Sequence, residues 1–254
     1  MKHPGVVVVG VGPGDPELLT LAAIKEIKQA TLVAYPVARE GGDSLAAAIA
    51  QEWLVESQNK LPLLFPMVSD AFCLKEAWAT ATDRLASEVL KGEQIVFLCL
   101  GDASLFATGS YVLMGLKERY PDCPVRMVPG VTSFSASAAT GLWPLALQQD
   151  QLLILATPDE PETLELILQN APQCGRVIAL LKLGSRWQWV RPLLEKMDLL
   201  NSALFAQRVG FSDEYVAKTS LVNETEKPYF SLLLIRQNCP VIMPHNIQNC
   251  INEL

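Results

Sequence analysis

The sequence has few histidines, no Cys-x-x-Cys motif and no Gly-x-Ser-x-Gly nucleophile motif of hydrolases. Each absence argues against one kind of site. His3 and His245 are the only histidines, which disfavours both a built-in zinc site and histidine-assisted nucleophilic catalysis. The six cysteines include no Cys-x-x-Cys pair, so we expect reduced thiols and no resident metal. No Gly-x-Ser-x-Gly motif occurs either. A reaction in which the ligand brings its own reactive group fits this chain better than hydrolysis.

Long apolar runs and an excess of basic residues are also missing. No apolar run reaches the roughly 20 residues of a membrane span, and the first residues lack the apolar core of a signal peptide. We therefore predict a cytoplasmic protein with no membrane partner. The formal net charge of −7 argues against a nucleic-acid partner, because a phosphate backbone needs a basic surface. An anionic small substrate needs only a local basic patch and stays open.

The composition that remains is that of a globular α/β protein. Apolar residues make up 50% of the 254 residues and charged residues 19%, enough for one large domain or two small ones. The run 95–100 is apolar on both faces, which is typical of a parallel sheet covered on both sides. A turn-rich break at 121–124 predicts two α/β lobes, residues 1–122 and 123–254. We expect the ligand to bind in the cleft between them.

Strand and helix patterns alternate along both lobes. The predicted strands are 5–10, 31–35, 95–100, 125–128, 152–156, 177–181, 202–206, 215–222 and 229–236. The predicted helices are 17–30, 44–56, 71–92, 105–119, 132–140, 160–169 and 186–199. Pro36 is expected to stop the second strand, and Asp15 and Asp70 to cap the helices that follow them.

The most informative stretch runs from Val6 to Thr20, a buried strand followed by a glycine-rich turn and a helix start. That order is typical of a nucleotide site, but the spacing departs from the known fingerprints. Asp15 stands where a dinucleotide site has its third glycine, and the first lysine after the turn is Lys25, too far along to complete a P-loop. A carboxylate beside the helix start repels phosphate, so the turn indicates a ligand without pyrophosphate.

Three more loops follow apolar strands. Asp102, after Gly101, presents a carboxylate that either accepts hydrogen bonds from a ligand or caps the next helix. The loop 129–133 offers free backbone N–H groups to a carboxylate, or is an ordinary helix cap. Lys182 and Arg186 place two cations at a strand end, where solvated charges are the alternative. With the first turn, these loops indicate a small-molecule site.

Five ordered blocks resemble the tetrapyrrole methylase family. They are Val9–Leu21, Gly101–Asp102, Pro129–Ser133, Leu181–Lys182 and Tyr229–Ile235, within residues 5–236. The resemblance implies a two-lobe α/β methylase, usually a homodimer, that holds S-adenosylmethionine in its cleft. The blocks Val33–Pro36, Phe65–Met67 and Pro129–Ala136 resemble in particular the members that methylate carbon 20 of precorrin-2 or cobalt-precorrin-2 in cobalamin biosynthesis.

The resemblance also implies roles for single residues. The implied cofactor-binding residues are Pro13, Leu100, Gly101, Asp102, Leu105, Thr132, Ser133, Lys182, Leu183, Gly210, Ser231 and Leu232. Pro36 occupies the place where some relatives carry an aspartate proposed as a base, which leaves the Tyr35 hydroxyl as the candidate catalytic group. The candidate cations for the substrate carboxylates are Arg39, Arg84, Lys182, Arg186 and Arg208. No metal is expected.

Other interpretations stay open at this point. The chain could be a methylase of the same family that acts at a different ring position or on a different substrate. It could also be a non-catalytic module that binds the cofactor without turnover. A dinucleotide oxidoreductase is disfavoured by the glycine spacing around Asp15. The sequence does not distinguish a metal-free tetrapyrrole substrate from a cobalt-containing one.

Overall fold

The computed structural model describes residues 4–68 and 70–238. The chain forms two compact units that divide between Thr132 and Ser133. This division falls later than the lobe boundary expected after residue 122. The reason is that β5 (Val125–Val128) pairs in parallel with β1 (Gly5–Gly10), so residues beyond the turn-rich break still belong to the first sheet. The predicted α/β class is confirmed, with one sheet in each unit.

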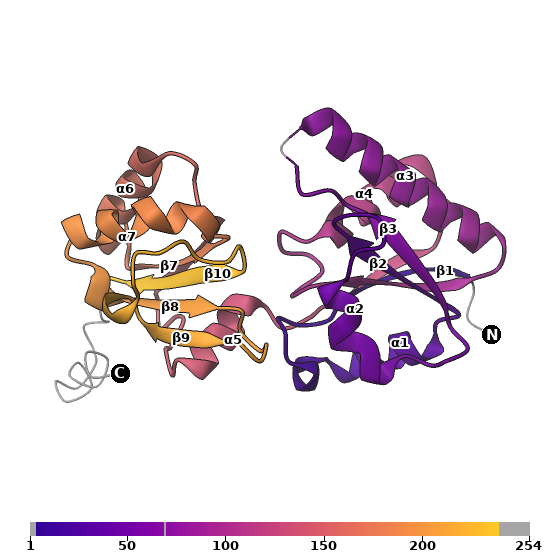
Figure 1. Ribbon diagram of the computed structural model, residues 1–254, viewed down its shortest axis with the longest axis horizontal. Helices are drawn as coiled ribbons and strands as arrows, with labels where there is room; N and C mark the ends of the chain where they lie inside the picture. Colours follow the sequence, from indigo (N-terminus) through magenta and orange to yellow (C-terminus); the bar gives the residue numbers. More distant parts are fainter. Residues whose placement is uncertain (1–3, 69, 239–254) are drawn as a thin grey trace. The chain divides into compact units, whose positions relative to one another are not determined.

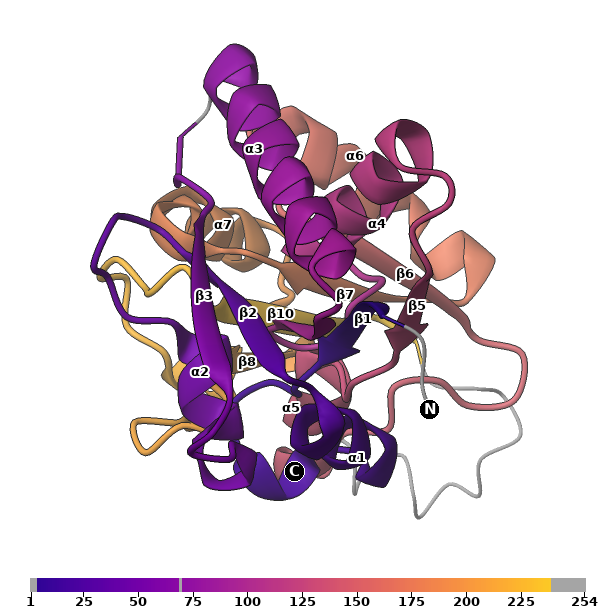
Figure 2. The same ribbon diagram turned by 90° about the vertical axis from the view of Figure 1, so that its right-hand side faces the viewer.

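The first unit is a parallel sheet of five strands in the order β3-β2-β4-β1-β5. The remaining strands are β2 (Leu32–Val37), β3 (Asn59–Leu64) and β4 (Gln94–Cys99). Its helices are α1 (Leu21–Gln29), α2 (Leu45–Ala50), α3 (Ala71–Leu90) and α4 (Thr108–Arg119), with short 3-10 turns at Pro16–Leu18 and Gln51–Trp53. Figures 1 and 2 show α3 and α4 over one face of this sheet and α1 and α2 over the other.

Burial explains why these strands are apolar on both faces. Val8 and Phe97 are fully buried on the side of α3 and α4, where they pack with Leu85 and Leu116. A strand such as β4 is flanked by strands on both edges and by helices on both faces, so it has no solvated side. All five strands point the same way, and their carboxyl ends therefore lie along one edge of the sheet.

Two sequence predictions in this unit were wrong in detail, and one strand was missed. Pro36 does not stop β2 but lies inside it, because β2 pairs with β4 only as far as Ala34 and continues against β3 alone. The predicted helix 17–30 is a 3-10 turn and a separate α1, since the Thr20 hydroxyl caps α1 by accepting a hydrogen bond from the Ala23 N–H at 3.1 Å. The edge strand β3 was missed because Lys60 and Pro62 interrupt its apolar pattern.

The second unit is a mixed sheet in the order β6-β7-β10-β8-β9. Its strands are β6 (Gln151–Ala156), β7 (Arg176–Leu181), β8 (Ala203–Gln207), β9 (Tyr215–Lys218) and β10 (Ser231–Arg236). Its helices are α5 (Ser133–Thr140), α6 (Pro161–Asn170) and α7 (Trp187–Lys196), with 3-10 turns at Pro172–Cys174, Gly184–Arg186, Leu200–Ser202 and Thr219–Leu221. β6 and β7 are parallel, and β10, β8 and β9 pair antiparallel.

The core of the second unit lies between its sheet and α6 and α7. Trp187 and Phe205 are both fully buried there, with ring centroids 5.1 Å apart. On the sheet side away from that core, the buried Arg236 forms a 2.5 Å ion pair with Asp150 and donates a hydrogen bond to the Pro144 carbonyl. This pair ties the segment after α5 to the last strand of the unit.

Candidate active site

The loops that follow β1, β4 and β5 pack together through their backbones. Gly12 and Gly101 exchange two backbone hydrogen bonds, with N···O distances of 3.2 and 2.7 Å. A Cβ atom on Gly10 would lie 2.6 Å from the Gly101 carbonyl oxygen and 2.7 Å from the Gly130 nitrogen. We call Gly10, Gly12, Gly101 and Gly130 the glycine cluster. It brings three of the four loops singled out in the sequence to one edge of the first sheet.

Asp102 fastens two of these loops to each other. One carboxylate oxygen accepts hydrogen bonds from the Ser104 N–H, at 2.9 Å, and from the Ser104 hydroxyl, while the other accepts one from the Gly130 N–H at 2.9 Å. Burial alone raises the pKa of this carboxyl, but the hydrogen bonds from Ser104 and Gly130 outweigh it and hold the pKa below its usual value. The group is therefore ionised at neutral pH, and it orders the loop whether or not it also contacts a ligand.

The other predicted residues of the first unit lie within a few positions of these glycines in the sequence. Pro13 is buried in the turn after β1, while Leu100 and Leu105 are half-buried on either side of Asp102. Thr132 ends the first unit, and Ser133 begins both α5 and the second unit. Their contacts with a ligand remain predictions.

In the second unit, two loops hold the start of β10. The Leu183 N–H donates to the Ser231 carbonyl at 3.1 Å, and the Arg208 N–H donates to the Phe230 carbonyl at 2.8 Å. Leu232 pairs with Leu181 of β7 and with Ala206 of β8. The predicted residues Lys182, Leu183, Ser231 and Leu232 are thus brought together at one end of the second sheet, and Gly210 follows in the loop after β8.

Ser231 is the most informative of these residues. Its side chain is 2% exposed, and its hydroxyl has no hydrogen-bond partner among the described residues. A buried hydroxyl without a partner is costly, so such a group in a native structure calls for an explanation. An additional donor or acceptor at this place, such as a polar group of a ligand, would satisfy it.

Two basic residues beside Ser231 have strained backbones. Lys182 has φ of 61° and Arg208 has φ of 46°, in the left-handed region that favours glycine. Both strained residues follow directly after strands, and the hydrogen bonds to Phe230 and Ser231 hold their loops in place. Strain of this kind collects at functional sites, where it fixes a side chain that a relaxed loop would release.

The predicted cations are mostly paired with carboxylates. Arg84 lies 3.7 Å from Glu88, Arg186 pairs with Asp159, and Arg208 lies 2.6 Å from Asp213. Arg39 is exposed and forms no ion pair with any residue that the structure describes. Three of the four arginines must therefore exchange an internal carboxylate for a substrate carboxylate if they bind one.

Tyr35 lies inside β2, half-buried and paired in register with Pro62 of β3. It is in the carboxyl half of its strand, beyond the last residue that pairs with β4. Since the strands are parallel, this half points to the same edge of the sheet as the glycine cluster. The position is compatible with an orienting hydroxyl, which stays a prediction.

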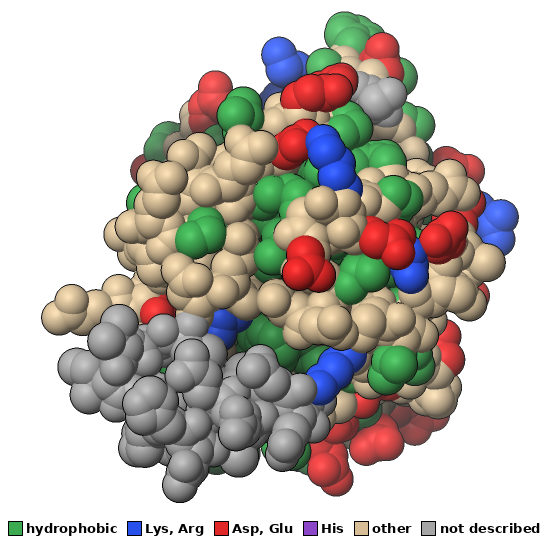
Figure 3. All heavy atoms as spheres, turned by 90° about the vertical axis from the view of Figure 1, so that its left-hand side faces the viewer, with side chains coloured by type: hydrophobic (Ala, Val, Ile, Leu, Met, Phe, Trp, Pro, Cys, Tyr) green, Lys and Arg blue, Asp and Glu red, His purple; other side chains and the backbone are tan. Residues whose placement is uncertain are grey.

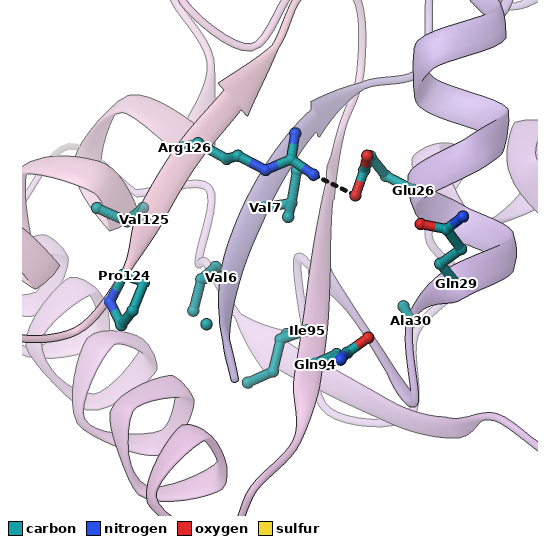
Figure 4. Close-up of a pocket in the computed structure, with 11 residues that line it drawn as sticks. Val6, Val7, Glu26, Gln29, Ala30, Gln94, Ile95, Pro124, Val125 and Arg126 are labelled. Atoms are coloured by element: carbon teal, nitrogen blue, oxygen red, sulfur yellow. Dashed lines mark ion pairs between the residues drawn. The ribbon is translucent and has the colours of Figure 1, made fainter. Parts of the chain in front are cut away.

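Two hollows of the first unit lie elsewhere. One, of about 370 Å³, is formed at the amino ends of β1, β4 and β5 and is lined by Val6, Val7, Ile95 and Val125, with the Arg126–Glu26 ion pair across it (Figure 4). The other, of about 500 Å³, lies between β3 and α3 and is lined in part by Arg84. Apart from Arg84, neither hollow includes a residue predicted for the site, so hollows alone do not locate it.

Sequence reasoning missed the residues that support the site. Ser104 could have been found, because Asp-x-Ser is the pattern of a turn in which the aspartate accepts hydrogen bonds two residues ahead. Glu214, which accepts a 2.7 Å hydrogen bond from the Gly210 N–H, gave no local signal. Across the described residues, no group of three or more His, Cys, Asp or Glu side chains is arranged to hold a metal ion.

Comparisons with known proteins show the family of this chain. A family model described as Tetrapyrrole (Corrin/Porphyrin) Methylases matches residues 5–223. The cobalt-precorrin-2 C(20)-methyltransferase of Salmonella typhimurium is 31% identical over 234 residues, which cover 90% of this chain and 94% of that protein.

Solved structures share the fold. The crystal structure of the methyltransferase CobJ superposes with a TM-score of 0.68 at 21% identity, covering 91% of this chain and 93% of that one. The uroporphyrin-III C-methyltransferase of Thermus thermophilus, in complex with S-adenosyl homocysteine, superposes with a TM-score of 0.62 at 24% identity, covering 91% and 96%.

Proposed function

Because the chain belongs to the tetrapyrrole (corrin/porphyrin) methylase family, we propose that it methylates carbon 20 of precorrin-2 or cobalt-precorrin-2 in cobalamin biosynthesis. The observation that carries this proposal is the 31% identity to the Salmonella typhimurium C(20)-methyltransferase along nearly the whole of both chains. The methyl donor is S-adenosylmethionine, and its product S-adenosylhomocysteine is the ligand named for the Thermus thermophilus structure.

The residues of the two loop regions fit this cofactor. An ionised Asp102 suits a ligand that carries hydroxyl and ammonium donors, and the unpartnered Ser231 hydroxyl suits a further polar contact. When bound, S-adenosylmethionine supplies an electrophilic methyl group on a sulfonium. The turn after β1 contributes Pro13 to the pocket wall, and we assign the other implied cofactor-binding residues their roles on the same basis.

The protein then acts mainly by placement. Holding the reacting groups in line and excluding water can lower a barrier by roughly 7–11 kcal/mol in favourable cases. No covalent protein nucleophile is needed, in keeping with the absence of a hydrolase motif from the sequence. We assign the Tyr35 hydroxyl the task of orienting the substrate.

The substrate carries several carboxylates, which an acidic protein must meet with local cations. Lys182 and Arg208 are the best supported, because their strained backbones hold both side chains beside Ser231. Arg39, Arg84 and Arg186 are the other candidates. Arginine suits this task because it pairs with a carboxylate through two parallel hydrogen bonds.

We further propose a cytoplasmic homodimer without nucleic-acid or membrane partners. On the face drawn in Figure 3, lysine and arginine side chains are separated from one another by acidic and apolar ones, unlike the basic stripe of a nucleic-acid site. None of the helices in the described part of the chain is long and apolar enough to cross a membrane. Retention of labelled RNA or DNA by the purified protein at physiological salt would contradict the proposal that it has no nucleic-acid partner.

The decisive experiment is methyl transfer. The protein is mixed with S-adenosylmethionine labelled in its methyl group and, separately, with precorrin-2 and cobalt-precorrin-2. Label on carbon 20, located by mass spectrometry and NMR, is the expected result. The substrate that is methylated faster shows whether the enzyme acts on the metal-free or the cobalt-containing ring. Label on another carbon assigns a different ring position, and cofactor binding with no transfer to either tetrapyrrole overturns the proposal.

A further inference from the structure

Two exposed aromatic residues stand directly before the buried start of β10. Tyr229 is 39% exposed and Phe230 is 40% exposed, whereas Ser231, the next residue, is 2% exposed. In a strand, consecutive side chains point to opposite faces, but residues 229–230 form a bend and both are exposed. A single exposed apolar side chain is ordinary, while adjoining ones mark a place where another molecule binds.

The bend that carries these two rings is fixed in place. The Phe230 carbonyl accepts a hydrogen bond from the Arg208 N–H at 2.8 Å, and the Ser231 carbonyl accepts one from the Leu183 N–H at 3.1 Å. The rings of Tyr229 and Phe230 pack edge to face, with centroids 5.3 Å apart and planes at 79°. Backbone and rings are thus ordered without a ligand, so little conformational entropy is lost when one packs against them.

Two cations border the aromatic pair. The Lys182 Nζ lies 6.0 Å from the centre of the Tyr229 ring. The Arg208 guanidinium lies 4.5 Å from the centre of the ring of Phe211, in the loop after β8. Contacts of this kind hold a cation over an aromatic face while its N–H groups remain available to an anion. An aromatic surface with cations at its margin suits a ring-shaped ligand that carries carboxylates at its edge.

The acidic residues nearest to these cations are engaged within their own loop. Asp213 forms an ion pair with Arg208 at 2.6 Å, and Glu214 accepts a hydrogen bond from the Gly210 N–H at 2.7 Å. A ligand carboxylate that binds Arg208 therefore replaces Asp213. Because one carboxylate is exchanged for another, this ion pair adds little net affinity, and contact with the aromatic rings must supply most of the binding here.

We propose that Tyr229 and Phe230 bind the tetrapyrrole substrate, with an aromatic ring lying against the face of its macrocycle. The inference rests on the proposed function and deepens it by naming residues that hold the substrate. Ser231 and Leu232, which are assigned to the cofactor, are the next two residues and are buried. One short segment therefore serves both ligands, with its buried residues at the cofactor and its exposed residues at the substrate.

Charge favours the tetrapyrrole over the cofactor as the ligand of the two rings. S-adenosylmethionine carries a sulfonium and an ammonium group against a single carboxylate, so the side chains of Lys182 and Arg208 disfavour it at this place. The tetrapyrrole carries several carboxylates around an apolar, conjugated ring. It can contact the aromatic pair with its ring and both cations with its margin.

The test is the KM for the tetrapyrrole, measured beside the affinity for S-adenosylhomocysteine. Tyr229→Ala and Phe230→Ala are each expected to raise the KM about fivefold, because a ring contact is lost, and to leave the affinity for S-adenosylhomocysteine within about twofold. Tyr229→Phe keeps the ring and is expected to keep the KM within about twofold of the unmodified value. An unchanged KM in both alanine variants, or a loss of cofactor affinity that exceeds the rise in KM, overturns the inference.

Leu221→Ala is the matched control. Leu221 is 73% exposed in the turn after β9, which lies at the other end of the same sheet, because β9 runs from the Gln207 end of β8 to the Leu204 end. Its loss should change neither the KM nor the cofactor affinity. A rise in KM equal to that of the two alanine variants would show a general effect of removing apolar surface and overturn the inference.

A direct binding measurement separates this inference from the proposed reaction. Precorrin-2 and cobalt-precorrin-2 are titrated, with absorbance as the readout, into protein saturated with S-adenosylhomocysteine, so that no methyl group is transferred. Both alanine variants are expected to bind the tetrapyrrole more weakly than the unmodified protein. If they do, but the unmodified protein transfers no methyl group in the labelling assay, only the proposed function fails. Methyl transfer by the unmodified protein with equal tetrapyrrole affinity in all variants overturns only the inference.

Discussion

The two units hold their predicted ligand-binding loops by opposite means. The first unit packs backbone against backbone, with glycines at closest approach and a carboxylate that links two loops. The second unit uses full side chains on strained backbone, at Lys182 and Arg208, and the Ser231 hydroxyl has no hydrogen-bond partner in the described part of the chain. The first arrangement is complete in itself, while the second carries costs that a bound ligand would offset. Rigidity is therefore expected from the first unit, and ligand-dependent stabilisation from the second.

The largest effect is expected at Gly130. Gly130→Ala places a Cβ against the backbone of Gly10 and Gly101, where nothing flexible can move aside. Overpacking of this kind costs typically 1–3 kcal/mol of stability, and we expect the upper end together with loss of measurable cofactor binding. Thermal denaturation and calorimetry with S-adenosylhomocysteine measure the two.

Gly175→Ala is the control for that variant. Gly175 has φ of 56° and open space around its Cβ position, so it tests left-handed strain without close approach. A loss of about 1 kcal/mol with unchanged cofactor affinity is expected there. If Gly130→Ala behaves the same way, the backbone packing of the glycine cluster is not what positions the ligand.

Asp102→Ala is expected to weaken cofactor binding at least tenfold, about 1.4 kcal/mol. Asp70→Ala, which removes the cap of α3, is the control and should leave the affinity unchanged. If calorimetry gives the same cofactor affinity for Asp102→Ala and the unmodified protein, Asp102 is not part of the binding site.

The same residue also predicts a pH dependence of stability. The folded-state pKa of Asp102 is lowered, so its contribution is present above the unfolded value of about 3.9 and is lost as the pH falls through the folded value. Asp102→Asn removes this titration. Stability is measured by denaturation between pH 2 and pH 6, about two units on each side of the unfolded-state pKa. The variant is expected to lose less stability than the unmodified protein as the pH falls, and an equal loss in both proteins would contradict the prediction.

A smaller effect is expected from relieving strain. Lys182→Gly adopts the left-handed backbone at no steric cost and is expected to stabilise the second unit by up to about 1 kcal/mol. It should also raise the KM for the tetrapyrrole, because a cation is lost. Lys60→Gly, at a position on β3, serves as the comparison and should destabilise. A destabilised Lys182→Gly protein would show that the backbone at residue 182 is not strained.

The smallest effect is expected at Ser231. Ser231→Ala removes a hydroxyl that has no partner, so stability without ligand should be unchanged or slightly higher, while cofactor affinity falls about threefold, or about 0.6 kcal/mol. Thr219→Val is the matched control, since the buried Thr219 hydroxyl also finds no partner among the residues that the structure describes, and no ligand is assigned to it. Equal responses of cofactor affinity in the two variants would contradict a ligand contact at Ser231.

The sequence predicted the elements that are strongly apolar and missed those set by distant partners. β4 was predicted because residues 95–99 have no polar side, and β3 was not, because an edge strand tolerates Lys60 and Pro62. The loops were located correctly at strand ends, since that follows from the α/β order. The ion pairs that occupy the predicted arginines were not foreseeable, because Asp159 is 27 residues from Arg186 and nothing local links them.

The strand order of the first sheet also governs how the chain folds during synthesis. β1 is completed at Gly10, but its partner β4 begins only at Gln94, 84 residues later. At 5–20 residues per second that interval lasts roughly 4–17 s. Throughout it, Val6 to Val9 form a β-branched run with no neighbour to pair with, the composition that associates with other chains. Of the strands in the first sheet, β1 has the longest interval between its own synthesis and that of its first pairing partner. β1 is therefore the segment of this unit that most needs protection from association before folding is complete.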